Sequence, residues 1–274
     1  MLAAASRGAL AAAQSRLTDL ASGLPEAAGI AGVADGLFAV VRLLDGAGQL
    51  RRTLADPTTP AQAKNDLLDS LLGSQLDPLP MQVLQQAVAQ RWSGARDMVD
   101  GLEVLAVQAR FIVAEADGSL DDVEDELFRF ARIVAHDPAL RAVLTDRSLD
   151  NDRKSELLDA LLRERVRPAT LSIVRQLVLS PRGRTLEAGL EEYAALAAGI
   201  RSRSVATVTS AVALDADQQD RLAAALSRTL GRDVQIQVEV DPKVVGGLVV
   251  RVGDEVIDGS TLHRLREARR AFAS

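Results

Sequence analysis

Apolar residues recur at spacings of three and four through most of the first 200 residues, which predicts a series of amphipathic helices. One such face, between residues 120 and 134, is formed by Leu120, Val123, Leu127, Phe130, Ala131 and Val134. The first 20 residues show a weaker form of this pattern, with Leu2, Ala13 and Leu17 near one face. An amphipathic first helix explains that segment better than a transit peptide does, because no cleavage site follows it.

The helical part contains an internal repeat. Residues 35–72 align with residues 125–162 without a gap, and 14 of the 38 positions are identical, where composition alone would give about three. The identical pairs include Asp35/Asp125, Phe38/Phe128, Arg42/Arg132 and Lys64/Lys154. Phenylalanine and lysine are scarce in this chain, so matched pairs of these residues are strong evidence for a repeat. The sequence therefore predicts two copies of one helical unit, each about 90 to 100 residues long.

After Ile200 the spacing of apolar residues changes from three or four positions, typical of a helix, to the pattern typical of strands. Residues 205–209 are rich in β-branched side chains, residues 234–240 alternate strictly, and residues 248–252 form a further apolar run. The turn at Gly253-Asp254 predicts a hairpin into a last strand. These features predict a small α/β domain at the C-terminus.

Two helices are expected within this domain. Asp215 and Gln218 have the spacing of a capping box and predict a helix start. Asp258 is expected to begin a last helix with a basic side. The predicted fold is mainly α, with two tandem copies of a helical-bundle unit followed by the small α/β domain. The expected domain ranges are 1–104, 105–200 and 201–274.

Composition excludes several classes of function. The net charge is −6, and aromatic residues make up only 3% of the chain, so a nucleic-acid partner is not expected. The chain has no cysteine, which excludes disulfides and thiolate metal sites. It has no apolar run of the roughly 18 residues that span a bilayer, so direct membrane insertion is not expected.

Candidate chemistry is sparse, and each candidate has a structural explanation. His136 and His263 lie in different predicted domains and have no third ligand at metal-site spacing. Asp254 and Asp258 suit a hairpin turn and a helix cap better than an acid–base pair. The glycines at 246–247 lead into a strand, so they lack the helix N-terminus that phosphate loops use. We expect no catalytic residue, no metal and no cofactor.

The acidic cluster at residues 121–126 has two possible interpretations. Acidic side chains at the start of a helix interact favourably with the helix dipole, and this reading is favoured. A docking site for a basic partner is the alternative. The basic side of the last helix is likewise read as a solvated or partner-facing surface in preference to a lipid-binding one.

Residues 240–254, followed by Val256-Ile257-Asp258-Gly259-Ser260, resemble the C-terminal signature of the ATP synthase delta subunit family, whose mitochondrial form is the oligomycin-sensitivity-conferring protein. The resemblance covers about residues 105–274. The signature residues, which we expect to be structural, are Asp241, Pro242, Gly246, Gly247, Gly253, Asp258 and Gly259.

The resemblance implies a non-catalytic stator subunit in the peripheral stalk of a rotary, proton-translocating ATP synthase. In that family the helical domain receives N-terminal helices of the alpha subunits, and the C-terminal domain binds the stalk b subunit. The implied location is the cytoplasmic face of the cell membrane, as a peripheral part of the complex. The expected contact residues are Phe111, Val123 and Leu127 for the alpha helices, and Val249 and Arg251 for the stalk.

The first 100 residues depart from the pattern of single-copy relatives, which have one helical domain. The second copy is favoured for head binding because it adjoins the C-terminal domain, as in those relatives. Two rival hypotheses remain at this point: an unrelated helical scaffold with a similar α/β module, and an enzyme that uses the Asp254–Asp258 region.

Overall fold

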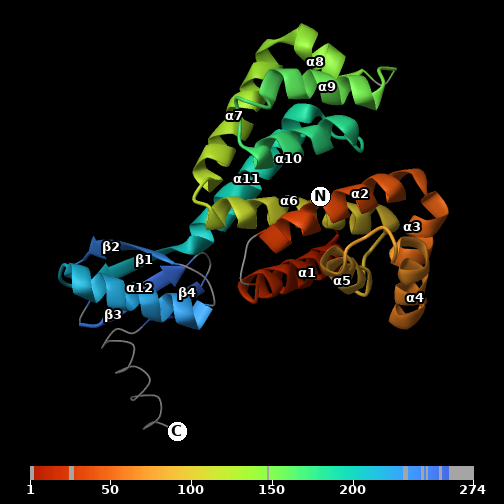
Figure 1. Cartoon of the computed structure of the whole chain (residues 1–274). Coiled ribbons are helices and arrows are strands. Elements are labelled where there is room, and N and C mark those ends of the chain that lie inside the picture. Colours follow the sequence, from red (N-terminus) through yellow and green to blue (C-terminus); the bar gives the residue numbers. More distant parts are fainter. Residues whose placement is uncertain are drawn as a thin grey trace. The chain divides into compact units, whose positions relative to one another are not determined.

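A computed structural model describes residues 3–24, 28–146, 148–230, 234–241, 244, 246–252 and 255–258. The chain forms two compact units, Met1–Ala197 and Ala198–Ser274 (Figure 1). The first is helical, and the second contains a small sheet with a helix. The predicted fold class, mainly α with a small α/β part, is confirmed.

The helices of the first unit follow the repeat found in the sequence. They are α1 (Ala4–Ser22), α2 (Ala28–Gly46), α3 (Gly48–Ala55), α4 (Ala61–Leu72), α5 (Pro78–Val88), α6 (Ala95–Ala116), α7 (Leu120–His136), α8 (Pro138–Thr145), α9 (Asn151–Leu162), α10 (Pro168–Leu179) and α11 (Leu186–Ser204). Helices α3, α4 and α5 begin 90 residues before α8, α9 and α10 respectively. The helices therefore recur at the same interval of 90 residues as the aligned positions of the sequence.

Helix α6 belongs to both halves of this unit. It packs against α1, α2 and α5, and also against α7 and α10. Its buried residues surround the helix instead of forming one stripe, as expected for a helix that is covered on all sides. The predicted division between residues 104 and 105 falls within α6, and the assignment of separate domains at 1–104 and 105–200 stays a prediction.

The buried faces of the helices are those that the apolar spacing indicates. In α1, Ala9, Ala13 and Leu17 are buried. In α7, the six residues that share one face in the sequence pattern are all buried. The start of α8 is fixed by Asp137, whose Oδ1 accepts a hydrogen bond of 2.9 Å from the backbone N–H of Leu140. Local capping and the burial of one apolar face thus account for these helices.

The second unit is a four-stranded sheet with one helix packed on it. Its elements after α11 are β1 (Val205–Ser210), α12 (Ala216–Leu230), β2 (Gln235–Val240), β3 (Leu248–Val252) and β4 (Glu255–Asp258). The strand order is β2-β1-β3-β4. Strands β1 and β2 are parallel, joined through α12, and the other two pairs are antiparallel. The core joins Leu226 of α12 to Ala206, Val208, Val250 and Val252 of the sheet.

The capping box predicted at Asp215 is present. The Gln218 backbone N–H donates to Asp215 Oδ1 at 2.8 Å, and the Asp215 N–H donates to Gln218 Oε1 at 3.1 Å. The two hydrogen bonds satisfy backbone donors at the start of α12. The last helix predicted after Asp258 lies outside the described residues.

Gly36 in α2 lies where a side chain has no room. A Cβ atom there would lie 2.6 Å from Pro80 Cβ and 2.8 Å from Leu76 Cδ1. At the equivalent positions of the second copy, Thr170 Oγ1 donates a 2.5 Å hydrogen bond to Glu126 Oε2. The two copies therefore join these helices by different means: close packing in the first and a hydrogen bond in the second.

We expect Gly36→Ala to lower the free energy of unfolding by about 1–3 kcal/mol, because the added methyl group overpacks α2 against Pro80. Gly32→Ala in the same helix is the control, since nothing lies within 4 Å of its added Cβ. This control should raise stability by about 0.4–1 kcal/mol. Urea unfolding followed by circular dichroism measures both, and equal stability of the two variants would contradict the packing argument.

Candidate protein-interaction surfaces

The three helical residues predicted to contact a partner lie inside the protein. Phe111, Val123 and Leu127 are fully buried. Their apolar spacing marks the core-facing side of α6 and α7. Phe111→Ala or Val123→Asp would therefore disturb folding before it tested binding. A direct contact role for these residues stays a prediction, and exposed apolar side chains of the same helices are better placed.

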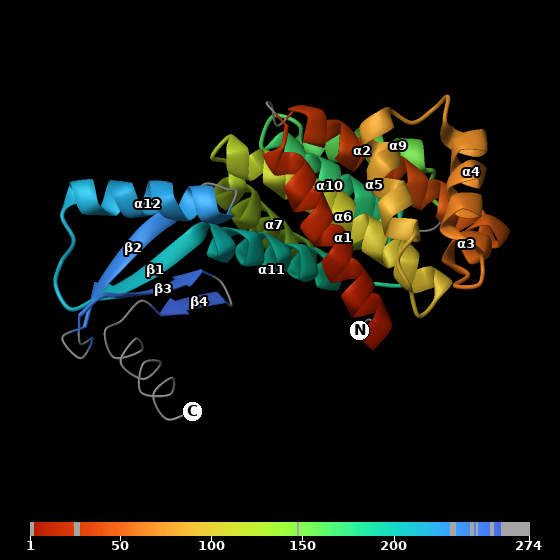
Figure 2. The same ribbon diagram turned by 90° about the horizontal axis from the view of Figure 1, so that it is seen from below.

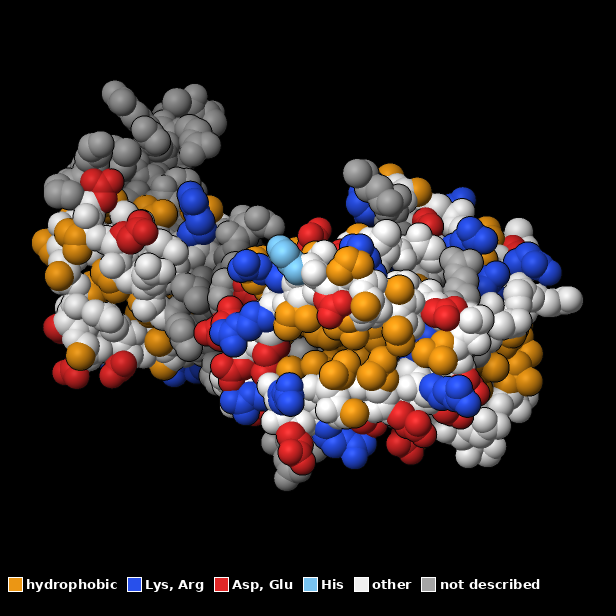
Figure 3. All heavy atoms as spheres, turned by 90° about the horizontal axis from the view of Figure 1, so that it is seen from above, with side chains coloured by type: hydrophobic (Ala, Val, Ile, Leu, Met, Phe, Trp, Pro, Cys, Tyr) orange, Lys and Arg blue, Asp and Glu red, His pale blue; other side chains and the backbone are white. Residues whose placement is uncertain are grey.

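An apolar groove lies between α7, α8 and α9 in the second copy, with a cavity volume of about 310 Å³. Its apolar lining consists of Phe130, Ile133, Leu140, Leu161, Leu162 and Val166. Glu126, Arg129 and Arg165 complete the lining with charged groups. Ile133 is 54% exposed, and a patch of apolar side chains gathers on this side of the molecule (Figure 3). An apolar groove with charged edges suits an amphipathic helix.

The first copy has counterparts of two of these apolar residues. Leu43 and Leu71 lie 90 residues before Ile133 and Leu161, and both are exposed. Exposed apolar side chains at repeated positions are unlike the scattered single residues of an ordinary surface. Each copy thus presents apolar side chains from a corresponding pair of helices, α2 and α4 in the first copy and α7 and α9 in the second.

The two copies are joined along α2. Asp35 forms an ion pair with Arg110 of α6, and Arg42 Nη1 donates to Gln176 Oε1 of α10 at 3.0 Å. Arg110 Nε also donates to Ser172 Oγ of α10 at 3.2 Å. Helices α2, α6 and α10 lie side by side (Figure 2). We call this contact of α2 with α6 and α10 the inter-copy joint.

A buried charged cluster adjoins the same region, since Gln176 Nε2 also donates to Glu103 Oε1 at 3.5 Å. Glu103 of α6 is 1% exposed and accepts a 2.5 Å hydrogen bond from Arg184 Nη2. Arg182 Nη1 lies 3.6 Å from Glu103 Oε2, and Arg184 Nη1 also contacts the Tyr193 hydroxyl at 3.4 Å. Burial raises the pKa of Glu103 above its usual range, while both arginines oppose that rise. Burial likewise raises the pKa of Tyr193. The cluster is enclosed by helices, so it fits a structural role.

The sequence contained only a faint signal for this cluster. Gly101-Leu102-Glu103 aligns with Gly189-Leu190-Glu191 in the repeat, but nothing local pairs Glu103 with an arginine 81 residues away. Gly101 itself permits close packing, because a Cβ there would lie 2.2 Å from the Trp92 ring.

The repeated lysines, Lys64 and Lys154, are buried as well. Lys64 Nζ donates a 3.2 Å hydrogen bond to the carbonyl of Val88, the last residue of α5. A cation at this end of a helix interacts favourably with its dipole. Burial lowers the pKa of Lys64, as expected for a charged group taken from water.

In the second unit, Val249 and Arg251 lie on the sheet face that faces away from α12. Alternation along β3 places them opposite Val250 and Val252, which belong to the core. Val249 is half-buried and Arg251 is exposed. Thr207 of β1 pairs with Arg251, and so does Val256 of β4. Their assignment as stalk contacts stays a prediction, on a sheet face where Arg251 is exposed among the residues that the structure describes.

The signature glycines have backbone conformations that other residues adopt rarely. Gly246 has φ 68° and Gly247 has φ 82°, values in the left-handed region that glycine tolerates. The backbone N–H of Asp241 donates to the Ser210 carbonyl at 2.9 Å, which ties the end of β2 to β1. Asp258 ends β4, opposite Val249. Pro242, Gly253 and Gly259 lie outside the described residues.

Neither a metal cluster nor a membrane-spanning helix is found among the residues that the structure describes. Within those ranges no three His, Cys, Asp or Glu side chains gather as metal ligands would. Likewise, none of the described helices is both long enough and apolar enough to cross a bilayer. Asp254 and His263, candidates in the sequence, lie outside these ranges.

Comparison with known proteins gives one consistent family. The family described as ATP synthase delta (OSCP) subunit matches residues 107–272. ATP synthase subunit delta of Streptomyces avermitilis is 49% identical over 270 residues, which cover 98% of each chain. The Streptomyces coelicolor protein of the same name is 48% identical with the same coverage, and that of Frankia alni is 44% identical over 273 residues. These relatives span the first helical copy as well as the part that the family matches.

Proposed function

The chain belongs to the ATP synthase delta (OSCP) subunit family, and from this premise we propose that it clamps the catalytic head of the synthase to the b-subunit stalk. It is a non-catalytic stator subunit of the peripheral stalk. Its work is mechanical: it resists the torque of the rotor through protein contacts. The observation that supports this proposal is the identity of 48–49% to ATP synthase delta subunits, which extends over 98% of their length.

The helical unit is proposed to bind the head. The groove between α7, α8 and α9 has an apolar lining with charged edges, as grooves that bind amphipathic helices do, and we assign to it an N-terminal helix of an alpha subunit. Apolar anchors at i, i+3, i+4 and i+7 of that helix would cover Ile133 and its neighbours. This assignment keeps head binding in the second copy but moves it from buried to exposed side chains.

The sheet unit is proposed to bind the stalk. The face around Val249 and Arg251 also carries Val256, which is 54% exposed, and Arg251 can pair with acidic groups of a helix. Through these partners the chain would lie at the cytoplasmic face of the cell membrane, as a peripheral part of the complex.

A pair of matched variants tests the head-binding groove. We expect Ile133→Asp to weaken binding of the full chain to a synthetic alpha N-terminal helix by at least about tenfold, because a carboxylate replaces an apolar anchor. Leu43→Asp is the control, since Leu43 is the repeat counterpart of Ile133 and is 43% exposed. Isothermal titration calorimetry measures both affinities. Loss of binding in Leu43→Asp alone would move the site to the first copy, and no loss in either variant would exclude both of these surfaces.

A further inference from the structure

A cavity of about 410 Å³ lies where α8, α9 and the segment from α10 to α11 meet. Its apolar lining includes the buried side chains of Leu144, Leu177 and Leu186. Asn151 and Gly183, which also line it, are exposed, so the cavity opens to solvent. Its volume falls in the range of about 300–1,000 Å³ that is typical of ligand sites. We call it the α8–α11 cavity, and it shares no lining residue with the groove assigned to an alpha helix.

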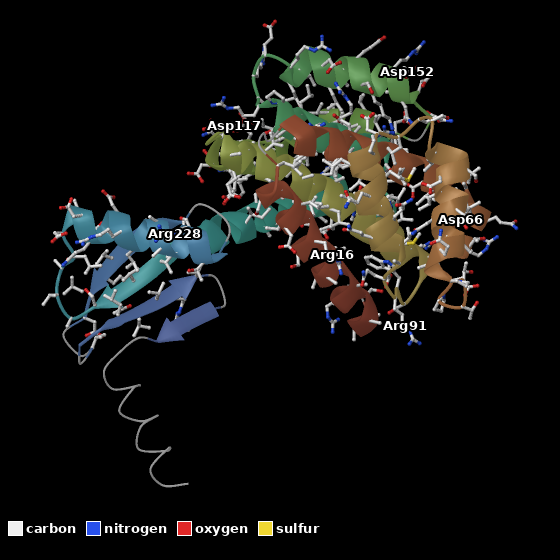
Figure 4. The ribbon with its side chains drawn as sticks, turned by 60° about the horizontal axis from the view of Figure 1, so that its bottom comes forward. Arg16, Asp66, Arg91, Asp117, Asp152 and Arg228 are labelled. Atoms are coloured by element: carbon white, nitrogen blue, oxygen red, sulfur yellow. The ribbon has the colours of Figure 1, made fainter. Side chains whose placement is uncertain are left out.

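Lys154 of α9 lines this cavity with an ammonium group that has no hydrogen-bonding partner. The residue is 5% exposed, and within the part of the chain that the structure describes its Nζ atom forms no hydrogen bond and no ion pair. Asp146 attracts Lys154 through space, but its Oδ1 accepts hydrogen bonds from the backbone N–H and hydroxyl of Ser148. Asp152, in the first turn of α9, is exposed (Figure 4). A buried ammonium without a hydrogen bond costs free energy, so an anion that reached it would bind favourably.

The charges around the cavity also favour an anion. Three cationic residues line it, Lys154, Arg182 and Arg184, and none of the described lining residues is acidic. Arg182 Nη1 donates to the carbonyl of Val99 at 3.0 Å. Arg184 Nη2 donates to Glu103 Oε2 at 2.5 Å. Both arginines are therefore occupied, and the ammonium of Lys154 is the cation that remains for a ligand.

The first copy offers a comparison, because it has a cavity of about 470 Å³ at the same position in the repeat. Lys64 lines that cavity, but its Nζ atom donates to the carbonyl of Val88 at 3.2 Å. Thr59 lines it where the α8–α11 cavity has Leu149. The first cavity thus has a more polar wall and a lysine that is already hydrogen-bonded, so it is not equivalent as a ligand site.

We propose that the α8–α11 cavity binds a small organic carboxylate. The carboxylate pairs with Nζ of Lys154, and the apolar body of the ligand lies against the leucines of the lining. Burial of hydrocarbon against these side chains favours an organic acid over an inorganic anion. A phosphate group carries more charge and needs several donors, whereas this site offers one ammonium without a partner. Such a site goes beyond the proposed mechanical function, because it uses none of the surfaces assigned to the head or the stalk.

Methyl NMR of the full chain, with isotope-labelled leucine methyl groups, tests the proposal with hexanoate as the probe. We expect saturable shifts of the Leu144, Leu177 and Leu186 signals at constant ionic strength, with a Kd on the order of 1 mM for a ligand of this size. Hexanamide has the same apolar body without the charge and should bind at least about tenfold more weakly. Inorganic phosphate should also bind at least about tenfold more weakly, because it has no apolar body.

Two variants identify the group that holds the carboxylate. Lys154→Met removes the ammonium but keeps the apolar stem, and it should weaken hexanoate binding by at least about tenfold. Lys64→Met, the matched change in the first copy, should leave the binding unchanged. Leu149→Glu is the second variant and tests the site with Lys154 in place. It puts a carboxylate on a half-buried position of the cavity wall, so it should compete with hexanoate and also weaken binding by at least about tenfold.

Thermal unfolding without ligand separates this role of Lys154 from a purely structural one. Lys154→Met should have a Tm equal to or above that of the parent chain, since it removes a buried cation without a partner. A lower Tm would assign the lysine a structural role and overturn the proposal. So would a titration without saturable shifts, equal binding of hexanamide or phosphate, or hexanoate binding that neither Lys154→Met nor Leu149→Glu weakens. Loss of binding in Lys64→Met alone would reject the second copy as the site.

Discussion

Phe38→Ala is expected to lower the free energy of unfolding by about 3–5 kcal/mol, whereas Phe128→Ala should lower it by less than about 1 kcal/mol. The two residues occupy identical positions in the two copies. Phe38 is 3% exposed, so its removal loses transfer free energy and leaves a cavity. Phe128 already faces solvent. The comparison isolates the effect of tertiary environment, because the residue type and the neighbouring Leu37 and Leu127 are the same in both copies.

Guanidinium chloride unfolding of the two single variants measures this difference. The double variant should show the sum of the two effects, because one side chain is buried on α2 and the other is exposed on α7. Equal destabilisation by the two substitutions would mean that Phe38 is not buried in solution.

Arg184→Met is expected to lower the free energy of unfolding by about 3–5 kcal/mol, because it leaves the buried Glu103 carboxylate with Arg182 at 3.6 Å as its remaining cation. Methionine retains much of the aliphatic volume, so the effect reports the lost charge. Arg163→Met is the matched control. Arg163 pairs with Asp159 at 2.9 Å but is 68% exposed, and such pairs contribute at most about 1 kcal/mol.

A second substitution checks the cause. Glu103→Gln removes the charge that Arg184 neutralises, so the double variant should be more stable than Arg184→Met alone. Thermal unfolding by differential scanning calorimetry at constant pH gives the comparison. If Arg184→Met behaves like Arg163→Met, the cluster is not desolvated as its geometry indicates.

The elements of the fold were largely predictable because they depend on local chemistry. The period of apolar residues indicated the buried face of α7, and the spacing of Asp215 and Gln218 indicated a capping box. The 90-residue repeat predicted the recurrence of α3–α5 as α8–α10. In each case the deciding interactions connect residues within a few turns of helix, so the sequence pattern carries them.

The contact residues were less predictable, for a physical reason. Phe111 and Val123 were chosen because they lie on apolar helical faces, but such a face is the one that folding buries. Exposed residues such as Ile133 and Phe128 interrupt the polar side of α7, where the pattern alone does not separate a binding anchor from an ordinary surface residue. The shared helix α6 was also missed, since a boundary estimated from repeat length places it between domains.

The sequence by itself determined the helical class, the repeat, the change to a sheet after residue 200 and the family resemblance. These are properties of residue type and short spacing. Only the tertiary structure decided which copy of a repeated side chain is buried, since Phe38 and Phe128 have the same local sequence signal and different exposure. It also decided that Glu103 meets Arg184 across 81 residues. Burial and pairing depend on what lies alongside a helix in space, and that neighbour is set by the packing of the whole unit.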